Sequence, residues 1–227
     1  NVLDRIKNKY PDLPMMLCSG GGGRSDYEAL QYFTEFWASD NTDPIERLFI
    51  QWGFSQIFPS KVMCAHVTTW NKNSSIKFRT DVAMMCKLGF DIKLTDMNEN
   101  EKFYCQSAVK NYNRLKTVIL DGDMYRLVSP YDGNHTSTMY ASKDNNKAVI
   151  FAFDIHPRYA EKTLPVRLQG LNPNKMYRVK EINLMPGANS SLPDNGKLLS
   201  GDFLMTVGLN LFTTQQLNSR VVEVSAE

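Results

Sequence analysis

The arrangement of apolar residues changes near residue 122, and this change limits what the chain can fold into. Before it, short apolar runs alternate with segments of helical spacing, whereas after it short strand-like runs follow one another between turn residues. The first pattern predicts an α/β unit over residues 1–122, and the second predicts an antiparallel β-sandwich over residues 123–227. About 120 residues of βα units are too few for a closed (β/α)8 barrel, which takes roughly 250 residues. They allow a small open sheet or part of a barrel.

The expected elements follow from periodicity and from breaker residues. In the first part we expect strands at 13–18, 61–67 and 90–94, and helices at 4–10, 27–36, 43–54, 80–88 and 98–116. In the second part we expect strands at 125–128, 138–142, 148–154, 165–168, 176–182, 201–204 and 220–224. The clearest helix start is Asp43-Pro44-Ile45-Glu46, which supplies an N-cap, a proline at the first helical position and an acidic first turn.

Charge and composition exclude several classes of partner. The 227 residues include 26 Lys and Arg against 24 Asp and Glu, a net charge of +2, and they contain no basic run. Neither nucleic acid nor a membrane is therefore an expected partner, and no stretch reaches the roughly 18 apolar residues of a membrane span. The four cysteines have no CxxC spacing, so we expect no metal site of that kind. No leader is recognised, and the compartment stays open between bacterial cytoplasm and periplasm.

A run of glycines follows the first apolar run, in the segment Cys18-Ser19-Gly20-Gly21-Gly22-Gly23-Arg24. Consecutive glycines are costly in chain entropy, so the folded state must need open backbone at this point. The segment lacks the GKS/T of a phosphate-binding P-loop and does not fit the GxGxxG of a dinucleotide site. A flexible turn is the alternative. Because the run follows an apolar strand, the pattern favours a loop that faces a ligand.

A second feature is Trp37-Ala38-Ser39-Asp40-Asn41-Thr42-Asp43. Two carboxylates beside a tryptophan suit acid–base chemistry on a sugar, with the indole as a stacking wall. Asp43 precedes Pro44 and is expected to cap a helix, which leaves Asp40 as the better catalytic candidate. Trp37 is equally compatible with a place in the core.

The remaining candidate residues carry weaker signals. His66 stands at the end of an expected strand, but a lone histidine is usually a structural group, and no catalytic triad can be assembled around it. His135 is expected at the surface. Trp52 and Trp70 are candidate sugar platforms, although the core is the better interpretation for Trp52.

In their order and spacing, the glycine run and the Trp37–Asp43 segment resemble the family 36 glycoside hydrolases, the α-galactosidases. That family has a strand ending in C-[SA]-[SG]-G-G-G-R, followed by W-x-S-D-[DN]-T-D-x-[IV]-E-R-L-x-I-Q-[YW]-G. The matching residues are Cys18 to Arg24, Trp37, Ser39 to Asp43, Ile45 to Leu48 and Ile50 to Gly53. The segment Met63-Cys64-Ala65-His66-Val67 also resembles the family's M-G-[AS]-H-V. The similarity covers about residues 11 to 95 and fades beyond them.

The resemblance implies a retaining hydrolase of terminal α-galactosyl residues, built on a (β/α)8 TIM barrel with a C-terminal antiparallel β-sandwich. By position it makes Asp40 the acid/base, and it implies that no metal or organic cofactor is needed. It places Cys18, Ser19, Gly20 and Gly21 in the substrate-binding loop, and we expect Trp37 to contact the sugar as well. The family's nucleophile belongs to a K-x-D-x-N motif, which should precede this segment and is not found here. The chain thus resembles the last units of the barrel, residues 1–122, and the β-sandwich domain, residues 123–227.

This interpretation sets the expected partners. They are an α-galactoside substrate and the missing N-terminal part of the same enzyme, with a homo-oligomer left open. The chain alone is expected to be inactive, because it lacks the nucleophile. The alternatives are an α-N-acetylgalactosaminidase, a galactosyl-transferring relative, or a non-catalytic carbohydrate-binding fragment.

Overall fold

The first part of the chain forms a parallel sheet. The computed structural model describes residues 1–18 and 20–227, and within them the strand order is β1-β2-β3-β4. The strands are β1 (Met16–Leu17), β2 (Glu35–Trp37), β3 (Met63–Thr68) and β4 (Lys87–Asp91), and all neighbours are parallel. Parallel neighbours need a crossover between them, and helical segments supply these connections.

Each α-helix of this part begins at a residue whose side chain caps it. They are α1 (Val2–Lys9), α2 (Pro44–Phe54), α3 (Ile76–Ala83) and α4 (Glu99–Asp121), with 3-10 turns η1 (Glu28–Gln31), η2 (Ser60–Val62) and η3 (Leu94–Asp96). Asp43 caps α2 by accepting hydrogen bonds from the backbone N–H of Ile45 at 2.9 Å and of Glu46 at 3.2 Å. Asn98 and Glu101 form a capping box at the start of α4.

The second part forms an antiparallel sheet in the order β5-β6-β7-β10-β8-β9. Its strands are β5 (Asp123–Val128), β6 (His135–Ala141), β7 (Lys147–Asp154), β8 (Met176–Ile182), β9 (Leu198–Ser200) and β10 (Asn218–Ala226). A short helix, α5 (Gly201–Thr206), follows β9. Helix α4 ends at Asp121 and β5 begins at Asp123, so the two parts join without a linker.

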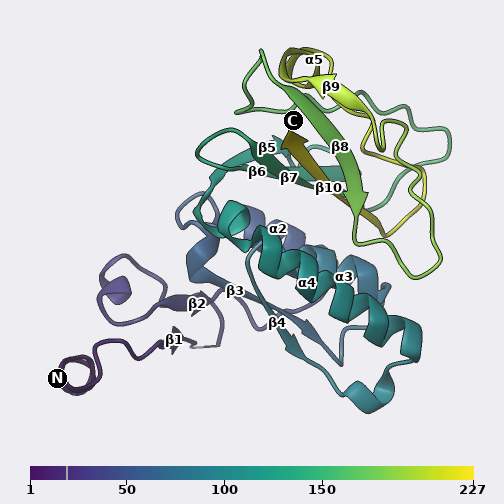
Figure 1. Cartoon of the computed structure of the whole chain (residues 1–227). Helices are drawn as coiled ribbons and strands as arrows, with labels where there is room; N and C mark the ends of the chain where they lie inside the picture. The colour runs from purple at the N-terminus through teal and green to yellow at the C-terminus, as the bar shows by residue number, and fades with distance from the viewer. Residues whose placement is uncertain (19) are drawn as a thin grey trace.

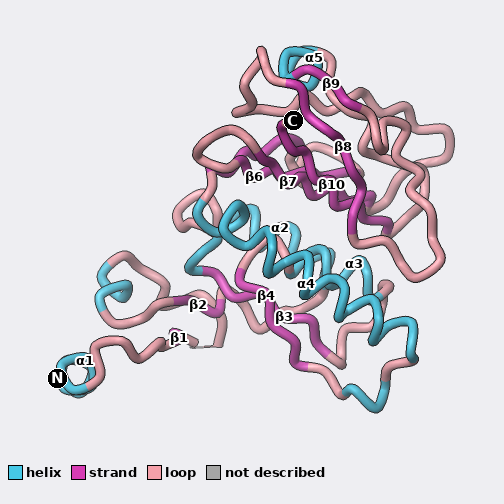
Figure 2. The backbone as a smooth tube through the Cα atoms, viewed as in Figure 1, coloured by secondary structure: helices cyan, strands magenta, loops and turns pink. Residues whose placement is uncertain are grey.

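Helices α2, α3 and α4 lie between the two sheets (Figure 1, Figure 2). Successive residues of a strand point to opposite faces, and in β7 this places Val149, Phe151 and Phe153 toward the helices. There they share one buried cluster with Phe78 of α3 and Leu115 of α4. The rings of Phe78 and Phe153 lie 5.5 Å apart in an edge-to-face arrangement. The two parts of the chain therefore share one hydrophobic core.

The opposite face of the antiparallel sheet has a core of its own. Ile150 and Ala152 of β7 pack there with Leu204 of α5 and with Val166 and Leu209. Over the described residues, this face is covered by α5 and by irregular chain rather than by a second sheet. Segment 165–168, expected as a strand, contributes only an isolated bridge between Val166 and Leu209. The predicted combination of a parallel sheet and an antiparallel sheet is confirmed, whereas the second layer of the expected sandwich is not a regular sheet.

Three further expectations are corrected by local interactions. Residues 27–36 form η1 and then β2 instead of a helix, because Phe36 enters the core against the rings of Phe54 and Phe58. The helix expected at 80–88 begins earlier, since the Ser75 side chain caps α3, and Lys87 already belongs to β4. Residues 201–204 are helical in α5, which is capped by the Ser200 side chain.

His135, expected at the surface, is buried in β6. Its Nδ1 lies 2.8 Å from Oδ1 of Asp154, a buried carboxylate on the neighbouring strand β7. The ring also lies against Phe212, with the ring centroids 4.7 Å apart. The pair on adjacent strands gives Nδ1 a partner inside the fold, and Nε2 lies 3.6 Å from Glu161 Oε1.

A buried carboxylate ties the helices to the antiparallel sheet. Asp81 of α3 is fully buried and accepts hydrogen bonds from Lys77 Nζ at 2.6 Å and Ser219 Oγ of β10 at 2.7 Å. It also accepts from the Tyr104 hydroxyl of α4 at 2.9 Å and from Nδ2 of Asn183, just after β8, at 3.0 Å. Burial and the neighbouring Asp81 raise the pKa of Tyr104 well above its usual value, so its hydroxyl stays a donor.

Replacing Asp81 should destabilise the protein strongly. In Asp81→Asn, an amide N–H2 group would face donors, and Lys77 would lose its counter-charge in a buried place. We expect a loss of about 3–5 kcal/mol in the free energy of unfolding, measured by chemical denaturation. Asp132→Asn is the control, because Asp132 is exposed, and it should change stability by less than about 0.5 kcal/mol. Similar small losses in both variants would contradict this role of Asp81.

Candidate functional site

The carboxyl ends of β1 to β4 lie along one edge of the parallel sheet, the edge at which ligand sites of such sheets form. Cys18 directly follows β1, Asp40 lies in the loop after β2, and Trp70 follows β3. The expected site residues are thus carried by neighbouring strands and their loops. Ser19, also expected in the site, lies outside the described residues.

The strand alternation aims two aromatic rings away from the helices. Met63, Ala65 and Val67 of β3 belong to the core shared with the helices. Since successive residues point to opposite faces, His66 points to the other face of the sheet. Trp37 lies there too, with its ring centroid 4.7 Å from that of His66. These rings form one wall at the carboxyl edge.

Asp40 is held at this edge by Trp37. The indole Nε1–H donates a hydrogen bond of 2.8 Å to Asp40 Oδ1, and the carboxylate is exposed to solvent. The loop that carries Asp40 is fixed by local bonds, because the Asn41 N–H donates to Ser39 Oγ and the Asp43 N–H donates to Asn41 Oδ1. Asp40 therefore combines an accessible carboxylate with a defined orientation. Asp43 is engaged in capping α2, as expected.

The glycine loop packs directly against the backbone beside Asp40. Gly20 and Gly21 have φ values of +64° and +95°, which favour glycine. A Cβ atom on Gly22 would lie 2.6 Å from the carbonyl oxygen of Ala38, and one on Gly21 would lie 3.6 Å from the Asp40 backbone nitrogen. The glycines therefore let two backbone segments approach each other, and the two sequence features meet in space.

Space for His66 is provided by another glycine. A Cβ atom on Gly89, the in-register neighbour on β4, would lie 2.3 Å from His66 Cδ2. Burial lowers the pKa of His66 below its usual value, which favours a neutral imidazole beside Trp37. Sequence reasoning gave His66 little weight. The available signal was a histidine in an otherwise apolar run, near the carboxyl end of the strand.

Further back, the same face of the sheet carries an ion pair. Lys87 Nζ of β4 lies 2.7 Å from Glu35 Oε2 of β2, on either side of Cys64 in β3. Burial, with a contribution from Glu35, raises the pKa of Cys64 to about 12. Cys64 is therefore a protonated thiol near neutral pH and not a nucleophile. This face is polar, unlike the face that the helices cover.

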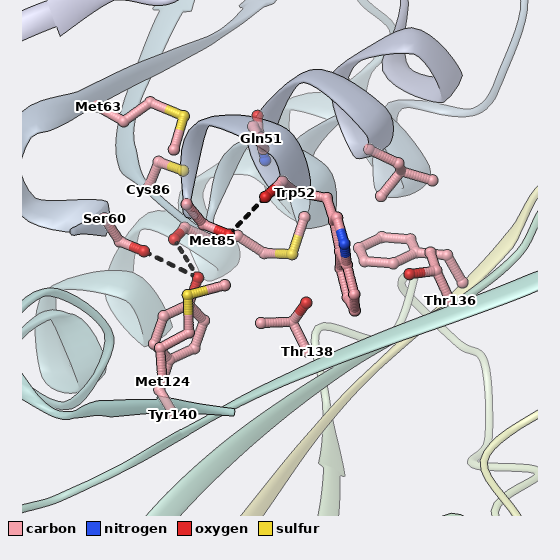
Figure 3. A pocket seen from close by; sticks show the side chains of 13 residues that line it. Gln51, Trp52, Ser60, Met63, Met85, Cys86, Met124, Thr136, Thr138 and Tyr140 are labelled. Atoms are coloured by element: carbon pink, nitrogen blue, oxygen red, sulfur yellow. Dashed lines mark hydrogen bonds between the residues drawn. The ribbon is translucent and has the colours of Figure 1, made fainter. Parts of the chain in front are cut away.

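The other two tryptophans, Trp70 and Trp52, lie in different environments. Trp70 is 61% exposed just after β3. Trp52 lines a small cavity between α2 and β6, together with Met85 and Tyr140 (Figure 3). The Tyr140 hydroxyl contacts Ser60 Oγ at 3.0 Å and donates to the Met85 carbonyl at 2.8 Å. Both hydroxyls thus have partners within the core, and neither Asp40 nor the glycine loop lines this cavity.

Among residues 1–18 and 20–227, no group of three or more His, Cys, Asp or Glu side chains is arranged to hold a metal ion. In the same part of the chain, no helix has both the length and the apolar character needed to cross a membrane.

Two protein-family models match this chain. A model of the family described as Melibiase matches residues 1–122, and a model described as the glycosyl hydrolase family 36 C-terminal domain matches residues 135–224. The chain belongs to glycoside hydrolase family 36. The match to Melibiase covers the parallel sheet with Asp40, and the second match covers most of the antiparallel sheet.

Individual relatives agree with this assignment. Alpha-galactosidase 2 of Hypocrea jecorina is 32% identical over 227 residues, which covers 97% of this chain and 29% of that protein. Alpha-galactosidase AgaA of Geobacillus stearothermophilus is 34% identical over 194 residues, covering 82% of this chain and 26% of the relative. The crystal structure of α-galactosidase AgaB from the same organism superposes with a TM-score of 0.88 at 31% identity, covering all of this chain and 30% of that one. The chain spans less than a third of the length of these relatives.

The position of His66 predicts a pH dependence. The unfolded chain binds a proton near the usual histidine pKa of about 6.5, whereas the folded chain resists it because the pKa is lowered. The contribution of His66 to stability should therefore be lost as the pH falls below about 6.5. His66→Phe keeps a ring against Trp37 and removes this titration. The difference in melting temperature, wild type minus variant, should be smaller at pH 5.5 than at pH 7.5. An unchanged difference would contradict the prediction.

Proposed function

We propose that this chain is the C-terminal part of a retaining α-galactosidase and that Asp40 is its acid/base. The observation that carries the proposal is the exposed carboxylate of Asp40, held by the Trp37 indole at the carboxyl edge of a parallel sheet and next to the glycine loop. Residues 1–122 would supply the last βα units of a (β/α)8 barrel, and residues 123–227 the C-terminal β-domain. The names of the relatives support the activity.

The uncovered face of the parallel sheet supports the barrel. Parallel sheets are normally covered on both faces, but in the described part of the chain helices cover only one face. The other face carries Trp37, His66 and the Glu35–Lys87 ion pair. In a closed barrel this face would become the interior, and further strands would pair with the free edges of β1 and β4. The preceding part of the same enzyme is the proposed source of these strands.

The proposed reaction is a double displacement. A carboxylate from the preceding part attacks the anomeric carbon, while the Asp40 carboxyl gives its proton to the glycosidic oxygen and the aglycone leaves. Asp40, now a carboxylate, then takes a proton from the water that attacks the galactosyl ester, and the nucleophile is released. The indole N–H engages Oδ1, so Oδ2 has no protein hydrogen bond among the described residues and can serve the proton transfer.

The proposed substrates are terminal α-galactosides. Crystal structures of AgaA variants in complex with raffinose and with stachyose, related to this chain at 30% and 31% identity, support this class. The loop residues Cys18, Ser19, Gly20 and Gly21 would contact galactose. Trp37 would form a wall of the pocket. Glycine backbone without side chains allows main-chain N–H groups to approach the sugar closely.

Asp40→Ala tests the acid/base assignment in the complete enzyme. We expect turnover of raffinose to fall by about 10²–10⁴, and the loss to be much smaller on the first step with a nitrophenyl galactoside, whose leaving group needs no proton. Added azide should attack the anomeric carbon of the galactosyl ester and displace the enzyme carboxylate, giving α-galactosyl azide, identified by NMR.

The product of this experiment separates the two carboxylate roles. Formation of β-galactosyl azide would mean that azide replaces Asp40 as the nucleophile, and the acid/base assignment would then be wrong. Asp43→Ser is the matched control, because it retains a side-chain oxygen to cap α2. It should leave turnover within about twofold of the wild type, since the proposed chemistry does not involve Asp43.

The 227-residue chain alone should not hydrolyse α-galactosides. Retention requires two carboxylates across the sugar, and only the acid/base has a counterpart here. Purified chain assayed with 4-nitrophenyl α-galactoside should release no nitrophenol above the uncatalysed rate, whereas co-expression with the preceding part should restore activity. Saturable hydrolysis by the chain alone would place a nucleophile within these residues.

A further inference from the structure

Beneath the candidate site lies a buried arginine without a carboxylate partner. Arg47, in the second turn of α2, is only 3% exposed. Among the described residues no Asp or Glu oxygen lies within salt-bridge distance of it, whereas the other fully buried arginine, Arg220, has Glu181 at 3.6 Å. A buried unpaired cation is expensive, and an apolar side chain of similar length would fill the same space at lower cost. Packing alone therefore does not account for a charged side chain at this position.

The contacts of Arg47 converge on the segment that carries Asp40. Its Nη1 donates to the carbonyl oxygen of Ser39 at 3.2 Å, which belongs to the peptide group joining Ser39 to Asp40. Its Cζ lies 5.4 Å from the centroid of the Trp37 ring, in a cation–π arrangement. Trp37 in turn donates to Asp40 Oδ1. The guanidinium thus reaches Asp40 by two routes, through the backbone and through the indole.

The other end of the guanidinium is anchored to the rigid part of the fold. Nη2 donates to the Cys64 carbonyl in β3 at 2.8 Å, and Nε donates to Gln51 Oε1 at 3.3 Å. Gln51 itself donates to the Val82 carbonyl of α3 at 3.0 Å. A planar guanidinium can make these directed bonds at once, whereas a lysine ammonium cannot match the geometry. Arg47 therefore locks the loop after β2 to β3 and to two helices.

We propose that Arg47 is a positioning residue for Asp40, which fixes the Ser39–Asp40 peptide and the Trp37 ring so that the Asp40 carboxyl points at the leaving-group oxygen. This inference rests on the proposed function. Proton transfer requires heavy atoms within hydrogen-bond reach, so a small displacement of the carboxyl should impair it without removing the pocket.

The test compares two substrates in the complete enzyme. Raffinose needs a proton on its leaving group, and 4-nitrophenyl α-galactoside does not. For Arg47→Lys we expect kcat/KM to fall about 10- to 100-fold on raffinose and less than about threefold on the nitrophenyl substrate. The ratio of the two values does not depend on how much of the preparation is folded. If Arg47→Lys yields too little enzyme, Arg47→Gln replaces it in this test, since it also removes the guanidinium that bonds the Ser39 and Cys64 carbonyls at once.

Matched variants separate positioning from stability. Arg220→Lys changes an equally buried arginine in β10 that donates to the Leu211 carbonyl at 2.8 Å, far along the chain from Asp40. It should lower the melting temperature and leave the substrate ratio unchanged. In an Asp40→Ala background, Arg47→Lys should no longer change the substrate ratio, because the residue through which it acts is gone.

The outcomes distinguish this inference from the proposed function. Equal losses on both substrates, or no loss on either, for Arg47→Lys would overturn the positioning role while a selective Asp40→Ala defect still supports the acid/base. An Asp40→Ala variant without substrate selectivity would instead overturn the proposed function, and with it the basis for Arg47. A selective defect in both variants, absent in Arg220→Lys, supports the inference.

Discussion

The structure depends on one hydrophobic core that two sheets share through the helices between them. Helices α3 and α4 present apolar residues to the parallel sheet on one side and to β7 and β10 on the other, and the same cluster contains Ala65, Phe78, Leu115, Phe151 and Val221. With no linker between α4 and β5, neither part buries its apolar face alone. The antiparallel sheet therefore supports the parallel sheet that carries the candidate site.

The two faces of the parallel sheet have different roles as a result. The face toward the helices holds the strands in place by burial of apolar side chains, so the loops at the carboxyl edge have a rigid base. The opposite face carries the polar groups Glu35, Lys87 and His66 together with Trp37. Within the described residues only this second face is left uncovered by helices, which is the division expected when a site is built on a scaffold of parallel strands.

Sequence reasoning predicted the two kinds of sheet, found α2 from its local capping signal and found α4 from the helical spacing of its apolar residues. It failed for residues 27–36, where helical spacing was overridden by the burial of Phe36 against rings distant in sequence. For the site, short motifs identified Asp40 and the glycine loop. They did not reveal the tilted contact of the His66 ring with Trp37 or the hydrogen bond from Arg47 to Ser39. Such contacts depend on strand register and helix placement, which no local pattern encodes.

In the Trp37–Asp43 segment, most polar groups are used by the fold, and one carboxylate stays accessible. The Asp43 carboxylate caps the first turn of α2, where its oxygen accepts hydrogen bonds from backbone N–H groups that would otherwise lack partners. The Ala38 carbonyl faces the glycine loop, and the Ser39 carbonyl faces Arg47. Asp40 is exposed and is not used to cap a helix. Because its neighbours in the loop are so engaged, its carboxylate has a fixed direction without being buried, which is what the proposed acid/base role requires.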